Sequence, residues 1–161
     1  MKIAVIYHSE TGNTKQMAEL VREGCEGVGG VEAKCMSIDA IDQAYLDEAR
    51  AVLLGTPTYE GTCSWQMKRF LDDGPKGLAG KLGGVFATER FLGGGATVAE
   101  MAMIGHMLVR GMLVYSTGTS QGQPMTHYGA VAIQAGDEEQ QERARVLGKR
   151  MAEKALELFG A

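Results

Sequence analysis

The sequence predicts an α/β fold in which a parallel sheet is covered by helices on both faces. Short apolar runs alternate with longer amphipathic segments along the whole chain, which is typical of βαβ units. The runs Ile3–Tyr7 and Ala51–Gly55 are apolar at nearly every position, as expected for strands that helices cover on both sides. No internal repeat or linker interrupts the alternation.

Four segments rich in β-branched, aliphatic or aromatic residues are predicted as buried strands, because glycine or polar turn residues bound each of them. They are Ile3–Tyr7, Ala51–Gly55, Val85–Thr88 and Met112–Ser116. A further strand is expected between Val31 and Ile38, where apolar residues alternate with Glu32 and Lys34. That alternation is typical of a strand at the edge of a sheet.

Helical periodicity follows the first strand, in a segment that starts at Thr14. One face of this helix holds Met17, Leu20, Val21 and Gly24. A brief helix is expected around Ile41 to Ala49, and another from Ser64 or Trp65 to Leu71.

Two longer helices are predicted in the second half of the chain. The first follows the glycines at 93–95, and its apolar face is predicted to contain Val98, Met101, Ala102, Leu108 and Val109. The second is opened by Asp137 as N-cap, with acidic residues in its first turn. Its buried face is predicted to contain Ala144, Leu147, Met151, Ala155 and Leu158.

Composition indicates one globular domain spanning residues 1–161, with 45% hydrophobic and 22% charged residues. The formal charge is −4 and the basic residues are scattered, which argues against nucleic-acid binding. No signal peptide and no apolar run approaching the roughly 18 residues of a membrane span is found, so we expect a cytoplasmic protein. Cys25, Cys35 and Cys63 form no CxxC pair, and neither a disulfide framework nor a metal site is predicted.

Ligands of doubly wound sheets bind at the carboxyl ends of the strands, so the loop after Tyr7 is the first candidate site. It reads Ser9-Glu10-Thr11-Gly12-Asn13-Thr14. Hydroxyl groups, inward-turned backbone N–H groups and a helix N-terminus suit a phosphate. Neither GxxxxGK[ST] nor GxGxxG occurs at this position, which argues against ATP or Rossmann-type NAD binding. The alternative is that Ser9 and Thr11 merely cap the helix.

The string from Val5 to Thr14, followed by Ala18, Leu20 and Val21, resembles the FMN phosphate-binding signature of the flavodoxin family. The resemblance implies a flavodoxin-like three-layer α/β/α fold with a five-stranded parallel sheet in the order 2-1-3-4-5. It also implies that FMN is the cofactor. The residues expected at its phosphate are Ser9, Glu10, Thr11, Gly12, Asn13 and Thr14.

The loop Thr56–Gly61 follows the next buried strand, where Pro57 restricts one backbone angle and Gly61 is free to adopt others. Taken alone, it is an ordinary strand-to-helix turn with Tyr59 on the surface. In the flavodoxin family this loop lies beside the isoalloxazine ring, and its backbone reorients toward the proton on reduced N5. The resemblance therefore implies ring contacts from Pro57, Thr58, Tyr59, Glu60 and Gly61.

Three segments are similar to the WrbA-type NAD(P)H:quinone oxidoreductases and the related NADPH-dependent FMN reductase-like proteins. They are residues 57–72, the glycine-rich stretch 88–95 and the motif Thr126-His127-Tyr128-Gly129-Ala130. This similarity implies further cofactor contacts from Thr88, Glu89, Arg90, Phe91, Gly93, Gly94 and Tyr128. His127 is a candidate catalytic proton donor to a quinone oxygen or a flavin carbonyl. The alternative is that His127 is an ordinary polar residue on the surface.

The chain departs from the WrbA pattern in lacking the insertion that helps those proteins form a tetramer, and in having Glu89-Arg90-Phe91-Leu92 in place of a small polar stretch. We expect an FMN-dependent oxidoreductase that moves two electrons from NAD(P)H to a quinone-like acceptor. One alternative is a flavodoxin that shuttles single electrons between redox protein partners. Another is an interaction module without FMN. The sequence does not determine whether the chain forms a homo-oligomer, and it does not identify the physiological electron donor, the acceptor or the reduction potential.

Overall fold

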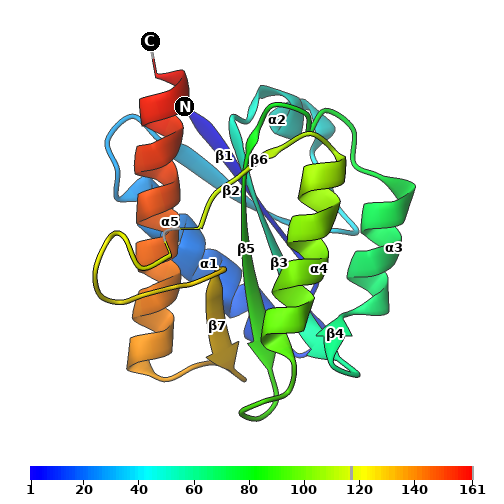
Figure 1. The fold of residues 1–161 in the computed structure, drawn as a ribbon. Coiled ribbons are helices and arrows are strands. Elements are labelled where there is room, and N and C mark those ends of the chain that lie inside the picture. The colour runs from blue at the N-terminus through cyan, green and yellow to red at the C-terminus, as the bar shows by residue number, and fades with distance from the viewer. Residues whose placement is uncertain (117, 161) are drawn as a thin grey trace.

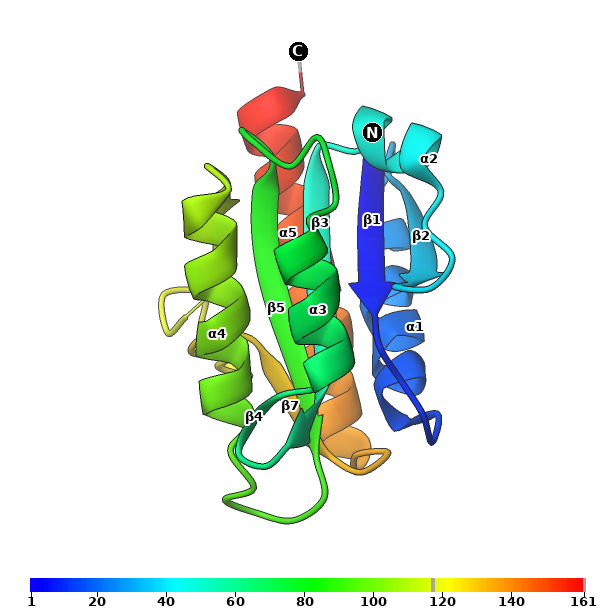
Figure 2. The same ribbon diagram turned by 90° about the vertical axis from the view of Figure 1, so that its right-hand side faces the viewer.

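A parallel sheet runs through the middle of the computed structural model, which describes residues 1–116 and 118–160 (Figures 1 and 2). The helices are α1 (Asn13–Glu26), α2 (Gln43–Glu48), α3 (Trp65–Asp73), α4 (Ala96–Val109) and α5 (Glu138–Phe159). The strands are β1 (Lys2–Tyr7), β2 (Glu32–Ser37), β3 (Ala51–Tyr59), β4 (Thr62–Cys63), β5 (Leu82–Glu89), β6 (Leu113–Val114) and β7 (Ala130–Ile133). Helices α1 and α5 cover one face, and α3 and α4 cover the other, so the predicted three-layer flavodoxin-like fold is confirmed.

The sheet order is β2-β1-β3-β5-β6, which is the predicted 2-1-3-4-5 order once the short β4 is left aside. The expected count of five strands is wrong, because the described residues form seven. Strand β4 turns back antiparallel onto the end of β3, through Glu60 and Gly61 at φ of 48° and 80°. The fifth position is shared by β6, beside Leu82–Gly83, and β7, beside residues 86–89.

The ends of the helices follow from their capping residues. Asp137 caps α5 as predicted, and its side chain accepts from the backbone N–H of Gln140 at 2.9 Å. Ser64 is the cap of α3 and accepts from the N–H of Met67 at 3.2 Å, so this helix begins at Trp65. Strand β2 is an edge strand as predicted, with Glu32 and Lys34 exposed.

The two helices on one face bury the predicted side chains. Met17, Leu20 and Val21 of α1 pack in one core cluster with α5. Ala144, Leu147, Met151 and Ala155 of α5 are fully buried in it. Leu158 is a correction, because it is 47% exposed and the neighbouring Phe159 packs against the cluster instead.

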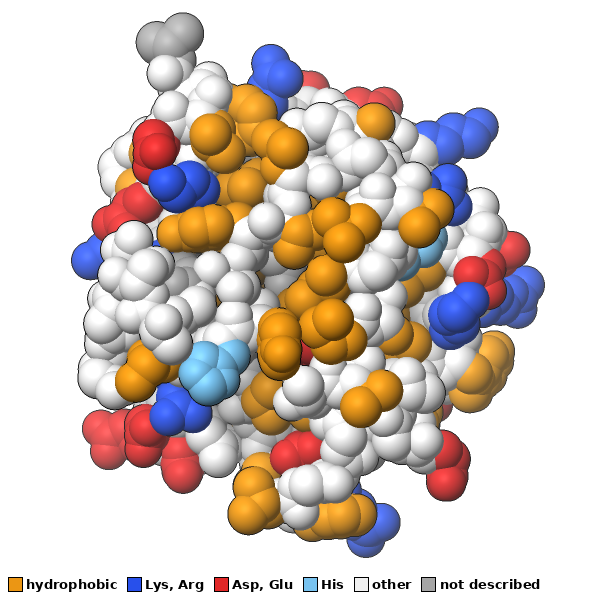
Figure 3. Space-filling model, viewed as in Figure 1, with side chains coloured by type: hydrophobic (Ala, Val, Ile, Leu, Met, Phe, Trp, Pro, Cys, Tyr) orange, Lys and Arg blue, Asp and Glu red, His pale blue; other side chains and the backbone are white. Residues whose placement is uncertain are grey.

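The predicted buried face of α4 is wrong. Val98, Met101, Leu108 and Val109 are exposed, and Ala102 is half-buried. The side that faces the sheet holds Ala96, Ala99, Glu100, Met103 and Met107. Because the helix is apolar nearly all round, its sequence did not determine which side turns inward. Apolar side chains consequently gather on the outer surface over α4 and toward β6 (Figure 3). Among the described residues, no helix is both long and apolar enough to cross a membrane.

Candidate functional site

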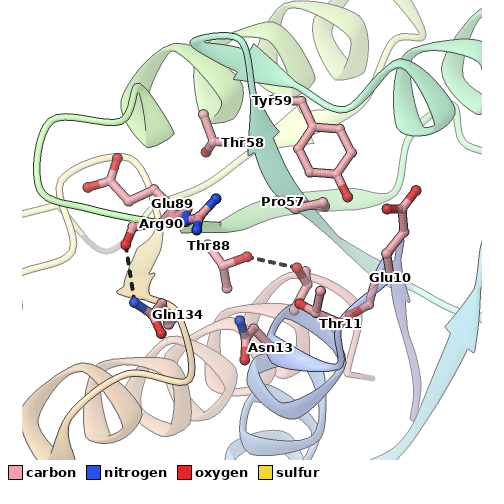
Figure 4. Close-up of a pocket in the computed structure, with 12 residues that line it drawn as sticks. Glu10, Thr11, Asn13, Pro57, Thr58, Tyr59, Thr88, Glu89, Arg90 and Gln134 are labelled. Atoms are coloured by element: carbon pink, nitrogen blue, oxygen red, sulfur yellow. Dashed lines mark hydrogen bonds between the residues drawn. The ribbon is translucent and has the colours of Figure 1, made fainter.

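A cavity of about 510 Å³ lies at the carboxyl ends of β1, β3 and β5, where the topology of the sheet places ligands (Figure 4). It is lined by Ser9, Glu10, Thr11, Asn13, Thr14, Pro57, Thr58, Tyr59, Thr88, Glu89, Arg90 and Gln134. The cavity thus brings together side chains from four segments that are far apart in the sequence, following β1, β3, β5 and β7. All of them except Gln134 belong to the set predicted from the sequence.

The loop after β1 turns sharply into α1. Gly12 is the N-cap of this helix with φ of 94°, a left-handed conformation that suits glycine. No side chain of the described residues caps the helix, and Ser9 Oγ instead accepts from the N–H of Gly12 at 3.2 Å. The interpretation of Ser9 and Thr11 as simple helix caps is therefore wrong. The N–H groups of the first turn have no acceptor within the helix and are available to an anion.

The end of β3 forms the opposite wall of the cavity, where Tyr59 and Glu10 lie near each other (Figure 4). The Tyr59 ring meets the ring of His8 edge-on, with centroids 6.2 Å apart. Burial, with the charge of Glu10 adding to it, raises the pKa of Tyr59. Burial lowers the pKa of His8, so this imidazole is neutral at pH 7.

Thr58 carries a polar atom that needs a partner. Its Oγ1 is buried and has no hydrogen-bond partner within residues 1–116 and 118–160. A buried hydroxyl without a partner costs free energy unless water or a ligand satisfies it. Because Thr58 lines the cavity, this orphaned hydroxyl fits a polar ligand there.

The loop after β5 closes the third side. The Glu89 carboxylate accepts from the N–H of Ala96 at 3.0 Å and so fixes the start of α4. Thr88 Oγ1 lies 2.8 Å from Thr14 Oγ1, a hydrogen bond that ties this loop to the first one (Figure 4). The Gln134 side chain donates to the carbonyl of Arg90 at 3.4 Å.

Gln134 is the lining residue that the sequence analysis missed, because β7 before it was not predicted. The apolar run Ala130–Ile133 between Gly129 and Gln134 is itself a strand signal of the kind used for the other strands. It would have placed Gln134 at the same edge of the sheet as the other loops.

The cavity is suited to a phosphate held by neutral groups. Arg90 is the one cation among its described lining residues, and none of those residues is a lysine. Hydroxyls of Ser9, Thr11 and Thr14 and the amide of Asn13 line it beside the N-terminal end of α1. Such an arrangement of donors binds an anion without a charged side chain.

Several predicted residues do not line this cavity. Gly12, Glu60, Gly61, Phe91, Gly93 and Gly94 lie in the same loops but outside the lining set. His127 and Tyr128 line a different cavity of about 410 Å³, which also includes the buried Glu100 of α4. His127 does not line the cavity at the strand ends, and its catalytic role stays a prediction.

Comparison with known proteins relates the chain to two groups. The family model for flavodoxin matches residues 5–96. A flavodoxin from Clostridium saccharobutylicum is 41% identical over 99% of this chain and 100% of its own length. An NAD(P)H dehydrogenase (quinone) from Archaeoglobus fulgidus is 27% identical over 98% of each chain. Among solved structures, a flavodoxin, WrbA-like protein from Agrobacterium tumefaciens superposes with a TM-score of 0.80 at 30% identity, over 97% of this chain and 98% of that one.

Proposed function

The chain belongs to the flavodoxin family, and from that premise we propose that it binds FMN in the cavity at the strand ends and transfers two electrons from NAD(P)H to a quinone-like acceptor. FMN is the cofactor of this family, and the lining residues fit it. Hydroxyls and a helix N-terminus face the place for a phosphate, and the orphaned Thr58 hydroxyl offers a hydrogen bond to a polar ligand.

Four side chains are proposed to hold the phosphate: Ser9, Thr11, Asn13 and Thr14. The hydrogen bond between Thr14 and Thr88 keeps this loop at a fixed distance from the end of β5. Pro57, Thr58 and Tyr59 are proposed to line the ring, and Glu60 and Gly61 form the tight turn next to them. When bound, FMN supplies the redox chemistry, since its ring accepts either a hydride or single electrons.

The observation that carries the two-electron proposal is that the cavity has one aromatic wall. Tyr59 is the single aromatic side chain among its described lining residues, while Phe91 is 63% exposed outside it. A ring covered by Tyr59 alone keeps its other face open to a small planar molecule. NAD(P)H could deliver a hydride there and leave, after which a quinone and two protons would take up the electron pair as hydroquinone.

The second candidate is a carrier that passes single electrons between redox proteins. The relative from Clostridium saccharobutylicum, named a flavodoxin and 41% identical, favours it. In that case the open face of the ring would dock against another protein instead of a small molecule. The two functions share the cofactor site and differ in the electron donor.

Anaerobic titration of the FMN-loaded protein with NADH and with NADPH distinguishes them. We expect either nucleotide to bleach the flavin absorbance in one two-electron step, and benzoquinone to restore it. Free FMN at the same concentration gives the background rate. If neither nucleotide reduces the bound flavin and dithionite reduces it in two separate one-electron steps, the carrier function is correct and the quinone reductase proposal is wrong.

A further inference from the structure

Helix α4 exposes apolar side chains where the other long helices expose charged ones. Its 14 residues contain two ionisable side chains, Glu100 and His106. Glu100 is 2% exposed, and His106 is half-buried with its pKa lowered by burial and by Arg110. The outer surface of the helix therefore carries no charge at pH 7.

The exposed apolar side chains continue beyond α4. We call them the α4 face: Val98, Met101, Leu108, Val109, Leu113, Met125 and Tyr128. Their exposed fractions run from 39% for Met125 to 85% for Val109. Met125 and Tyr128 lie across a shared cavity from Thr97 and Glu100, which makes the segment before β7 continuous with the helix. Figure 3 shows apolar side chains gathered over α4 on this side of the molecule.

Helices α1, α3 and α5 carry charged side chains on their outer surfaces, as expected of surfaces that face water. Ion pairs one turn apart cover α1, α3 and α5, for example Arg22 with Glu26, Lys68 with Asp72 and Arg143 with Glu139. Within the described residues, no such pair lies on α4. A helix that is apolar on all sides is normally buried on all sides. Exposed apolar patches of this kind mark interaction sites.

We propose that the α4 face is the surface through which two copies of this chain associate. The seven side chains are 39% to 85% exposed, so together they present an apolar area on the order of several hundred Å². A stable interface buries roughly 800 Å² on each partner and has an apolar centre within a polar rim, and the α4 face has the size of such a centre. An uncharged face needs an uncharged partner, because a charged one would lose its hydration without a countercharge. The same face on a second copy meets this requirement.

Gly105 gives the helix a surface on which another helix can pack closely. It lies between Met101 and Leu108 on the outer side of α4, and a Cβ placed on it would meet no atom within 4 Å. Two α4 helices related by a twofold axis could therefore place Met101 and Leu108 of each copy beside Gly105 of the other. Such an isologous contact closes after two copies.

The proposed dimer borders the cofactor cavity. Phe91 and Leu92 are 63% and 85% exposed in the loop that leads into α4. This loop follows Arg90, which lines the cavity. A second copy seated on α4 would lie next to that loop. The association itself rests on the α4 face and does not depend on the proposed reaction.

Sedimentation equilibrium of the full chain with FMN tests the proposal across about a hundredfold range of concentration. We expect the wild-type chain to show twice its 17.2 kDa mass. Leu108→Glu and Met101→Glu should shift the mass to 17.2 kDa, because each copy would then bury an unpaired charge. The matched control is Leu158→Glu, which places the same charge on an exposed leucine of α5 and should leave the dimer intact.

Far-ultraviolet circular dichroism and FMN titration of the same variants establish that they fold. A folded Leu108→Glu chain that stays dimeric would overturn the proposal. So would a wild-type chain of 17.2 kDa at every concentration. Cosedimentation of a monomeric wild-type chain with phosphatidylcholine vesicles would show instead that the face binds lipid.

Discussion

Glu100 is a carboxylic acid on the sheet-facing side of α4. It is 2% exposed, and its Oε1 has no hydrogen-bond partner in the described part of the chain. Burial raises its pKa from 4.5 to about 8, and the charge of Glu89 adds to the shift. The folded chain therefore keeps a proton that the unfolded chain loses above pH 4.5.

This difference predicts a stability that falls as pH rises. Between pH 4.5 and about 8 the native state binds one more proton at Glu100 than the unfolded state. The free energy of unfolding should then decrease by roughly 1.4 kcal/mol per pH unit from this residue alone. Urea unfolding of the wild-type chain at pH 5, 6, 7 and 8 gives the slope.

Substitution separates the charge of Glu100 from its burial. Glu100→Leu should remove the slope and raise the free energy of unfolding at pH 8 by about 2–4 kcal/mol, because it removes both the ionisation and the orphaned oxygen. Glu100→Gln should remove the slope while leaving a buried polar group in place. Glu153→Leu, at an exposed position of α5, is the matched control and should keep the wild-type slope. A wild-type slope in Glu100→Gln would contradict the assignment.

Single residues of the site differed in how well they could be predicted. Ser9, Thr11 and Thr14 were accessible from the sequence, because strand, polar loop and helix follow one another locally there. The burial of Glu100 was not, since it depends on the rotation of an apolar helix about its own axis. His127 was expected at the flavin from a local motif, but it lies in a turn before β7 that borders a second cavity, and a local motif does not determine which cavity a loop reaches.

Helices α1 and α5 touch through a pair of glycines. A Cβ on Gly148 would overlap the carbonyl oxygen of Val21, and a Cβ on Gly24 would overlap that of Arg145. Cys25 Sγ donates to the carbonyl of Gly148 at 3.3 Å, which shows how near the two backbones lie. This close contact joins the two helices that cover one face of the sheet.

The contact predicts that Gly148→Ala is destabilising, although alanine is the better helix former. The added methyl group must push α5 away from α1, at a loss of roughly 1–3 kcal/mol in the free energy of unfolding. Lys149→Ala, on the exposed side of the next residue, should change it by less than about 0.5 kcal/mol. Chemical denaturation of the two variants measures the difference. Equal stabilities would mean that the helices separate without cost.

The buried face of a helix could be predicted where its other side is polar, and could not where the helix is apolar all round. The inward face of α1 followed from its apolar spacing, because its other positions are charged or polar. Helix α4 offered no such contrast, and Ala96 and Ala99 face the sheet where larger apolar residues were expected. The split of the fifth strand was not predicted either. Met112–Ser116 was expected to form a single strand, whereas β6 covers Leu113–Val114 and the unpredicted β7 pairs with the rest of β5.

At the scale of the whole molecule, the candidate site is built from loops that are distant in the sequence. A ligand that contacts these loops stabilises the folded state by mass action, by about 2.7 kcal/mol at a hundred times its dissociation constant. FMN should therefore raise the midpoint of thermal unfolding. It should also slow amide hydrogen exchange in residues 8–14, 56–62 and 88–96 together.

Comparison of FMN with riboflavin tests which loop binds the phosphate and which binds the ring. Riboflavin lacks the phosphate, so it should protect residues 56–62 and leave residues 8–14 close to the ligand-free rates. The stabilisation should be smaller than with FMN at equal concentration. Equal protection of residues 8–14 by both ligands would mean that the loop after β1 does not bind the phosphate.

The interrupted fifth strand limits how the folded sheet can be extended by another chain. Along β5, the described pairing covers Leu82–Gly83 and then Phe86–Glu89, so the outer edge is broken into two short pieces. At the opposite edge, β2 exposes Glu32 and Lys34. Continuous, flat, uncharged edges are the templates on which chains add strands and aggregate. Neither described edge of this sheet offers such a template, so we expect no further copies of the chain to add to it by strand pairing.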